Sequence, residues 1–156
     1  MQGPIPARLQ DLGIVLPPPR QAIANYIPVK IAGSLLFVAG QVPYRNGEYP
    51  YVGKLGATIT IVAGQEAAKL CAINMLAQLN QFLDGDLDRI VSCVRLGGFV
   101  NSTPDFADHP KVIDGASNLI VEVFGAAGRH ARTAVGCSSL PNGIAVEVEG
   151  IFEFRP

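Results

Sequence analysis

The sequence lacks the residues and patterns by which many protein classes are recognised. It has no tryptophan, two histidines and three cysteines, and Cys71, Cys93 and Cys137 are far apart and form no Cys-x-x-Cys pair. These features give no grounds for a disulfide framework or a bound metal, so we expect neither. Glycine-rich loops of the kinds that bind phosphates or dinucleotides are also missing, and we therefore expect no cofactor.

Charged residues are scarce as well. They make up 16% of the 156 residues, the net charge is −1, and Lys and Arg form no run. This is a poor electrostatic match to nucleic acid, so no nucleic-acid partner is expected. No apolar stretch approaches the ~18 residues of a membrane-spanning helix, and no membrane association is expected. The first residues lack a basic start followed by an apolar segment, which argues against a secretory signal and for a cytoplasmic location.

Hydrophobic residues, in contrast, are plentiful. They form 49% of the sequence, and the mean hydropathy is positive. With no membrane segment expected, the extra apolar surface needs another protein surface to cover it, and a further copy of the same chain is the simplest cover. We therefore predict a homo-oligomer.

The order of turns and periodic segments predicts an α+β fold. Consecutive prolines from Pro17 to Pro19 set residues 1–24 apart as an N-terminal arm, and residues 25–156 fit a single domain. The expected elements are a hairpin at 27–39 turning at Gly33-Ser34, a helix at 60–83, a strand at 89–100, a helix from 107 or 112 to 124, and strands at 133–138 and 144–154. This ββαβαββ order predicts a mixed sheet with both helices packed on one face.

The last strand indicates how that sheet is used. Apolar and acidic side chains alternate along it, with Ile144, Val146, Val148, Phe152 and Phe154 on one face and Glu147, Glu149 and Glu153 on the other. A polar second face in a chain of apolar composition suits a sheet that meets a partner subunit across a partly hydrated cleft.

Arg132 and Glu147 are the first candidates for chemistry. Arg132 follows a glycine-rich turn at the start of a strand, where its planar guanidinium could bind a carboxylate through two parallel hydrogen bonds. Glu147 lies on the following strand, and we expect the two strands to pair antiparallel and bring the residues near each other. Glu147 could then orient or deprotonate a water molecule. The alternatives are a structural ion pair for Arg132 and a solvated carboxylate for Glu147.

Tyr26 and the histidines are further candidates. Tyr26 precedes the first strand, where its hydroxyl could meet a ligand or its ring could pack at the sheet edge. His130 lies two residues before Arg132 and belongs to the residue type most used in acid–base chemistry. It could equally be a hydrogen-bonding residue of a loop or an interface. His109, which precedes Pro110, is predicted to lie in a turn.

Several short motifs follow one another along the chain. Three of them are RTAVG from Arg132, LP from Leu140 and VEVE from Val146, and upstream stand Asn25-Tyr26 and the segment VAGQVP from Val38. Together they resemble the signature of the YjgF/RidA superfamily of reactive-intermediate deaminases, which includes proteins of the "endoribonuclease L-PSP" type. The resemblance spans residues 24–153, and the chain is most similar to a longer, less characterised branch.

The resemblance implies a chorismate mutase-like fold and a homotrimer with three clefts at the subunit boundaries. In deaminating relatives, the arginine at the position of Arg132 binds the substrate carboxylate and the glutamate at that of Glu147 positions the attacking water. The tyrosine at the position of Tyr26 lines the pocket. The implied activity is the cofactor-independent hydrolysis of small 2-imino or enamino acids to 2-oxo acids and ammonia, so the expected partner is a small carboxylate-bearing molecule.

Two positions depart from the deaminating relatives. Ala39 stands where they carry a serine and Ala134 where they carry a cysteine, so two polar groups are missing from the expected pocket. We count Ala39, Gly40, Ala134 and His130 among the substrate-binding positions. A non-catalytic trimer that binds small carboxylic metabolites is the alternative function. Ribonuclease activity, a historical label in the superfamily, is disfavoured because the chain has neither paired histidines nor a basic groove.

Overall fold

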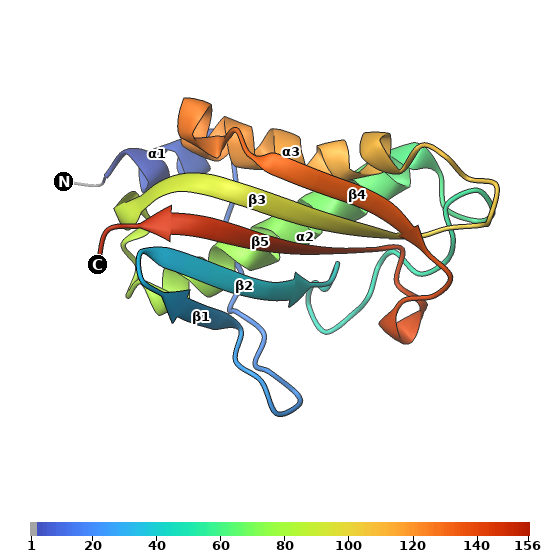
Figure 1. The fold of residues 1–156 in the computed structure, drawn as a ribbon, viewed down its shortest axis with the longest axis horizontal. Coiled ribbons are helices and arrows are strands. Elements are labelled where there is room, and N and C mark those ends of the chain that lie inside the picture. Colours follow the sequence, from blue (N-terminus) through green and yellow to red (C-terminus); the bar gives the residue numbers. More distant parts are fainter. Residues whose placement is uncertain (1–2) are drawn as a thin grey trace.

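A mixed five-stranded sheet forms the framework of the structure, a computed structural model in which residues 3–156 are described (Figure 1). The strands are β1 (Val29–Ala32), β2 (Leu35–Gln41), β3 (Ile90–Asn101), β4 (Ala131–Cys137) and β5 (Val146–Phe154). The helices are α1 (Pro4–Asp11), α2 (Ile61–Phe82) and α3 (His109–Phe124). In space the strands follow the order β1-β2-β5-β3-β4, with β3 and β4 parallel and the other neighbours antiparallel.

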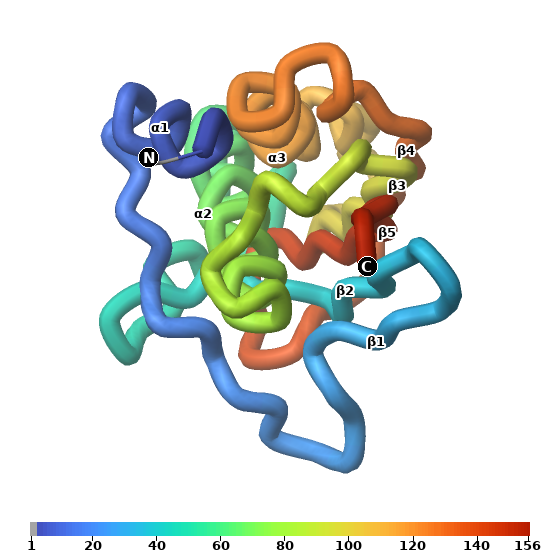
Figure 2. Tube along the Cα trace, turned by 90° about the vertical axis from the view of Figure 1, so that its left-hand side faces the viewer, coloured from blue at the N-terminus to red at the C-terminus, as the bar shows by residue number. Residues whose placement is uncertain are grey.

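This arrangement confirms the predicted α+β fold and its ββαβαββ order, which α1 precedes. The two long helices, α2 and α3, lie side by side on the same face of the sheet (Figure 2). Local signals set their ends. The Thr60 hydroxyl accepts a hydrogen bond from the Ala63 N–H at 3.1 Å and caps the start of α2. Gly125, with a φ of 62°, ends α3.

Side chains on the helix-covered face of the sheet form the core. Val146, Val148 and Phe152 of β5 are fully buried there, while the glutamates between them are only partly buried, which confirms the predicted alternation. Within residues 3–156, no helix lies over the opposite face (Figure 1). This open face leaves Phe37 42% and Val135 41% exposed, so a single chain does not cover its own sheet.

Small residues let the helices and the sheet approach one another closely. A Cβ atom at Gly98 would lie 2.5 Å from the Ile113 side chain, and one at Gly115 would lie 2.0 Å from the backbone oxygen of Gln65. Any larger residue would therefore push β3 away from α3, or α3 away from α2.

Residues 12–28 connect α1 to the first strand along the outside of α2 (Figure 2). The arm is anchored at its start, because Leu9 is buried in the core and the Ile5 N–H donates to the Asp88 carboxylate at 2.9 Å. The chain then loops out before β1. The domain boundary at residue 24 stays a prediction, and residues 1 and 2 lie outside the described part of the chain.

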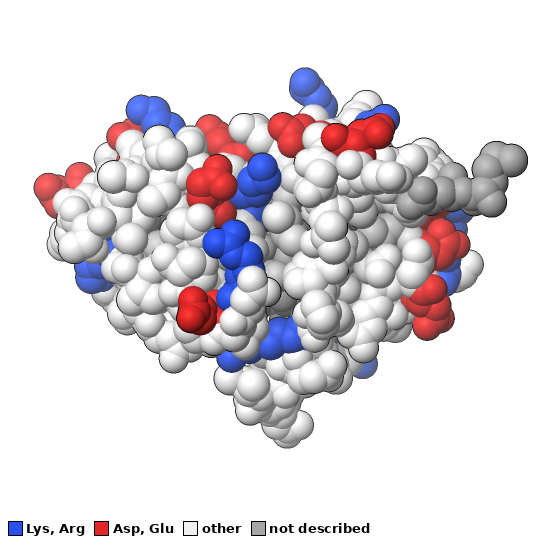
Figure 3. Space-filling model, turned by 180° about the vertical axis from the view of Figure 1, so that it is seen from behind, with Lys and Arg blue, Asp and Glu red and all other residues white. Residues whose placement is uncertain are grey.

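The surface is poor in charge. Seen from behind, Lys and Arg side chains gather in a band near the middle of a largely neutral face (Figure 3). The wide neutral area agrees with a charged content of 16%. Among the helices of residues 3–156, none combines the length and the hydrophobicity needed to cross a bilayer.

Candidate functional site

The strands that carry Arg132 and Glu147 are not neighbours, which corrects the pairing expected from the sequence. Arg132 in β4 lies beside Leu96 of β3 in a parallel ladder, and Glu147 in β5 lies beside Phe99 of β3 in an antiparallel one. β3 therefore separates the two residues. The reason is the connection through α3, because a strand, a helix and the next strand pack as a parallel pair. This leaves β5 to pair with the other edge of β3.

The two residues also lie on opposite faces of the sheet. Arg132 contacts α3 on the helix-covered face, whereas Glu147 alternates with the buried Val146 and Val148 and points to the open face. One chain thus has two separate candidate sites. We name them the Glu147 cavity, which includes Tyr26 and Gly40, and the Arg132 cluster.

The Glu147 cavity has a volume of about 250 Å³ and lies between the N-terminal arm, the end of β2 and the start of β5. Three of the predicted site residues line it: the exposed Tyr26, Gly40 and Glu147. The pairing of β2 with β5 shifts by one residue between Val38 and Gln41, which places a β-bulge beside the cavity. The bulge brings Gly40 under the side chain of Glu147.

Gly40 allows the Glu147 carboxylate to lie where it does. A Cβ atom at residue 40 would be 2.1 Å from Glu147 Oε1 and 2.9 Å from its Cδ. Burial, together with the nearby charge of Glu149, raises the pKa of Glu147 above its ordinary value. A carboxylate with a raised pKa is a better acceptor for a proton from water.

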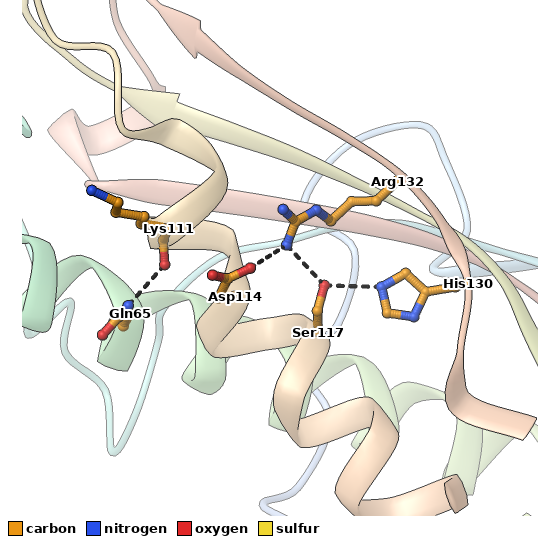
Figure 4. A network of polar contacts seen from close by, with 6 residues as sticks. All are labelled: Gln65, Lys111, Asp114, Ser117, His130 and Arg132. Carbon is orange, nitrogen blue, oxygen red and sulfur yellow. Dashed lines mark hydrogen bonds and ion pairs between the residues drawn. The ribbon is translucent and has the colours of Figure 1, made fainter. Parts of the chain in front are cut away.

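The Arg132 cluster joins β4 to α3 (Figure 4). Arg132 Nη1 donates to Asp114 Oδ1 at 2.8 Å and to Ser117 Oγ at 3.2 Å. Ser117 Oγ lies 2.9 Å from His130 Nε2, and His130 Nδ1 donates to the Gly128 carbonyl at 2.6 Å. Because that carbonyl can only accept, Nδ1 carries a proton, and in the neutral ring Nε2 accepts from the Ser117 hydroxyl.

Arg132 retains donors for a ligand despite its ion pair. Its side chain is 22% exposed, and within residues 3–156 both of its hydrogen bonds use Nη1. A guanidinium has five N–H donors in a planar fork, so the donors at Nε and Nη2 remain for a carboxylate. The structural ion pair considered from the sequence is therefore present, and it leaves the Nε and Nη2 donors of the guanidinium unused.

The two alanine positions lie on opposite faces. Ala39 lines a separate hollow on the open face, together with Glu149 and Ile151 of β5. Ala134 packs against the core on the helix-covered face, two residues along β4 from Arg132. Within one chain, the predicted substrate-binding positions thus fall into separate groups on the two faces of the sheet.

His109 lines neither site. It begins α3 instead of lying in the predicted turn, because Pro110 suits the first turn of a helix. Its Nε2 lies 3.2 Å from Ser102 Oγ. Across residues 3–156, no three His, Cys, Asp or Glu side chains are grouped so that they could hold a metal ion.

Several residues that line the two sites were missed in the sequence. Asp114 and Ser117 complete the Arg132 cluster. Their spacing of three residues on a helix could have indicated that both polar side chains lie on the same face. Arg20, Tyr49 and Asn142 line the Glu147 cavity. Arg20 follows the prolines in a segment without periodicity, so no sequence signal connects it to the cavity.

The strand order and the two helices on one face define the chorismate mutase-like class of α+β proteins. The particular family follows from the sequence. The chain belongs to the YjgF/RidA superfamily, because residues 6–148 match the family described as "YjgF/chorismate mutase-like, putative endoribonuclease". The family predicted from the motifs is thus confirmed.

Relatives share nearly the whole length of the chain. It is 45% identical to "Protein TCP17" of Trypanosoma cruzi over 154 residues, which cover 98% of this chain and 96% of that protein. The crystal structure of Atu1372 from Agrobacterium tumefaciens, a protein described as of unknown function, is 46% identical with a TM-score of 0.91, covering 97% and 92% of the two chains. A "putative endoribonuclease" of Shewanella oneidensis is 39% identical with a TM-score of 0.93, covering 97% and 100%.

A more distant likeness extends to TdcF of Escherichia coli, whose structure is described with bound serine. It is 20% identical with a TM-score of 0.61, covering 89% of this chain and 94% of TdcF. At this identity the likeness shows the fold alone, so the activity has to be argued from the site.

Proposed function

We propose that this protein hydrolyses small 2-imino or enamino acids to 2-oxo acids and ammonia without a cofactor. The observation that carries the proposal is the Glu147 carboxylate, which Gly40 admits into a small cavity and whose pKa is raised by burial. Arg132 supplies the second requirement, a guanidinium with unused donors for the substrate carboxylate.

The proposed enzyme is a homotrimer with an active site in each cleft between subunits. Arg132 and Glu147 lie on opposite faces of the sheet within one chain, so they can act on one small molecule only when they come from two copies. The exposed Phe37 and Val135 on the open face give a second copy an apolar surface to cover. We place this trimer in the cytoplasm.

In the proposed reaction, water adds to the imine carbon. Glu147 accepts one proton from the water as the new C–O bond forms and passes it to the imine nitrogen, which gives a carbinolamine. The hydroxyl proton then moves through Glu147 to the nitrogen, the C–N bond breaks, ammonia leaves and the C=O bond forms. One imine and one water thus give one oxo acid and one ammonia without oxidation or reduction. The imine is already electrophilic, so holding the reactants in position supplies most of what is needed.

A non-catalytic binding protein for small carboxylic metabolites is the second candidate. Ala39 and Ala134 remove two polar groups that deaminating relatives carry, and both side chains are apolar in this structure. TdcF, which shares the fold, is described with bound serine. A trimer of this kind would hold a carboxylate at Arg132 and leave it unchanged.

Ribonuclease activity is the third candidate and the least supported. His109 is hydrogen-bonded to Ser102 and His130 to Ser117, so the two histidines of the chain are not paired around one site. Acid–base cleavage of RNA needs two such groups at the same phosphodiester.

Trapping of imines tests the proposal. An amino-acid oxidase releases imino acids in the presence of semicarbazide, and an active deaminase lowers the yield of semicarbazone. We expect the native protein to lower it and Arg132→Ala and Glu147→Gln to have no effect. Arg45→Ala and Glu48→Gln alter exposed residues outside both sites and serve as matched controls that should act like the native protein.

An undiminished semicarbazone yield with the native protein, across several amino acids, would overturn the deaminase proposal. The binding protein would take its place if 2-oxobutanoate raised the melting temperature of the native protein and not that of Arg132→Ala. RNA degradation that Arg132→Ala leaves intact would point to a contaminant.

A further inference from the structure

The Glu147 cavity contains a cation from its own chain. Arg20, in the arm between α1 and β1, lines the cavity together with Glu147 and Tyr26. The arm reaches this place because it runs along the outside of α2 before turning into β1 (Figure 2). Each cavity therefore has an arginine and a glutamate among its lining residues before any second copy is added.

Contacts from two separate segments, α2 and the loop that follows β2, hold Arg20 in place. Gln78 of α2 donates from Nε2 to the Arg20 carbonyl at 2.7 Å. The guanidinium carbon lies 4.5 Å from the ring centre of Tyr44 and 5.4 Å from that of Tyr49, which are cation–π distances. Tyr49 in turn accepts a hydrogen bond from Asn142 Nδ2 at 3.3 Å. The two aromatic rings hold the charged group in place without supplying a carboxylate for its N–H donors.

Arg20 has no acidic partner within residues 3–156. The ion pairs of this part of the chain are Arg95–Glu149, Lys111–Asp108 and Arg132–Asp114. Glu147 shares the cavity with Arg20 and is not paired with it either. Arg20 is thus a positioned and unpaired arginine that lines a small cavity, with its guanidinium beside the ring of Tyr49, another lining residue, and such an arrangement can recognise an anionic group of a ligand.

We propose that Arg20 is a specificity-determining residue that binds a second carboxylate, so that the ligand of this protein is a small dicarboxylic acid. The proposal rests on the proposed function in one respect, since it takes the first carboxylate to be bound by Arg132 of the neighbouring copy. The ligand class is then a short 2-imino acid whose side chain ends in a carboxylate. The size of the cavity, about 250 Å³, lies just below the usual range of ligand pockets and suits a molecule of this size.

Calorimetric titration of two stable analogues tests the proposal without requiring turnover. The probes are 2-oxoglutarate, with two carboxylates, and 2-oxobutanoate, with one. We expect the native protein to bind 2-oxoglutarate at least about tenfold more tightly. Arg20→Gln should weaken 2-oxoglutarate by about ten- to hundredfold and change 2-oxobutanoate by less than about threefold, because only the dicarboxylate loses a charged hydrogen bond.

Two further variants complete the design. Arg20→Lys retains the charge and should keep part of the preference, although it lacks the planar fork. Arg45→Gln removes an exposed arginine of the neighbouring loop that does not line the cavity, and it should bind both probes like the native protein.

The outcomes separate this proposal from the proposed function. Equal binding of both probes by the native protein, or an Arg20→Gln change that weakens both to the same extent, would overturn the role of Arg20 even if imines are hydrolysed. A tenfold preference lost in Arg20→Gln would support it even if imine trapping shows no hydrolysis. If Arg20→Gln does not fold, Arg20→Lys decides instead: a partial loss of the native preference supports the role of Arg20, and an unchanged preference overturns it.

Discussion

Replacing Gly40 by alanine is expected to move one proposed catalytic group, the Glu147 carboxylate, and to change little else. The φ of Gly40 lies outside the left-handed region, so alanine fits the backbone. Its methyl group would lie 2.1 Å from Glu147 Oε1, 2.9 Å from Cδ and 3.2 Å from Cγ. Ordinary contacts between heavy atoms are about 3.5–4 Å, so the carboxylate must retreat by more than about 1 Å.

The magnitude follows from that displacement. A shift of about 1 Å in a group that positions a reactant costs about a hundredfold in rate. Stability should change by less than about 1 kcal/mol, since the clash is with the end of a flexible side chain and alanine restricts the unfolded chain more than glycine does. Gly40→Ala is therefore expected to be a folded protein with about 1% of the native activity.

Imine trapping and urea unfolding, measured on the same preparation, check this expectation. The double variant Gly40→Ala with Glu147→Gln provides the control, because moving a carboxylate that has already been removed should have no additional effect on the rate. A folded Gly40→Ala protein with native activity would refute the reasoning, since the position of the Glu147 carboxylate would then not matter.

Three further predictions concern the pH dependence, the core and the thiols. The pKa of Glu147 is raised in the folded state, so ionisation of this carboxyl lowers the stability of the native protein at neutral pH. Glu147→Gln should therefore unfold at a higher urea concentration than the native protein at pH 7. This gain in stability should vanish as pH falls below about 4.3, where the carboxyl is protonated in both the folded and the unfolded state. The same pKa shift predicts that the activity of the native protein falls as pH drops through the raised pKa of Glu147. Equal urea midpoints for the native protein and Glu147→Gln at pH 7 would contradict the predicted direction of the stability change. Gly115→Ala should lower the free energy of unfolding by about 1–3 kcal/mol, because the added methyl group forces α3 away from the Gln65 backbone. In the same urea assay, Asn118→Ala on the exposed side of α3 should keep the free energy of unfolding within about 0.5 kcal/mol of the native value. Burial raises the pKa of Cys93 to about 12 and raises that of Cys71 as well. A thiol reagent at pH 8 should therefore modify only the partly buried Cys137 quickly in the native chain, and all three cysteines after unfolding. Fast reaction of all three in the native chain would refute the burial of Cys71 and Cys93.

The elements of the fold could be predicted because their signals are local. Alternation marked β5, and a long apolar helical pattern from Thr60 to Leu83 marked α2. The pairing of Arg132 with Glu147 was wrong because adjacent strands in sequence were assumed to be adjacent in space. The unit β3-α3-β4 favours a parallel pair, and applying that rule would have placed β3 between the two residues.

The two candidate sites were harder to predict than the fold. Motifs identified Arg132, Glu147, Tyr26 and Gly40 through their resemblance to a family, and the structure shows which of them share a cavity. Arg20 is held by rings and an amide from segments far away in sequence, so its position depends on tertiary contacts alone. Contacts of this kind leave no periodic pattern in the chain.

Subunit exchange between two inactive variants tests the central claim most directly, namely that Arg132 and Glu147 from different copies form one hydrolytic site. Arg132→Ala and Glu147→Gln are mixed in equal amounts, dissociated, reassembled and tested by imine trapping, with exchange verified through a tag on one chain. Random reassembly leaves about a quarter of the clefts with both native residues, so we predict about a quarter of the native activity from two proteins that are each inactive. A reassembled mixture as inactive as its components would contradict the account.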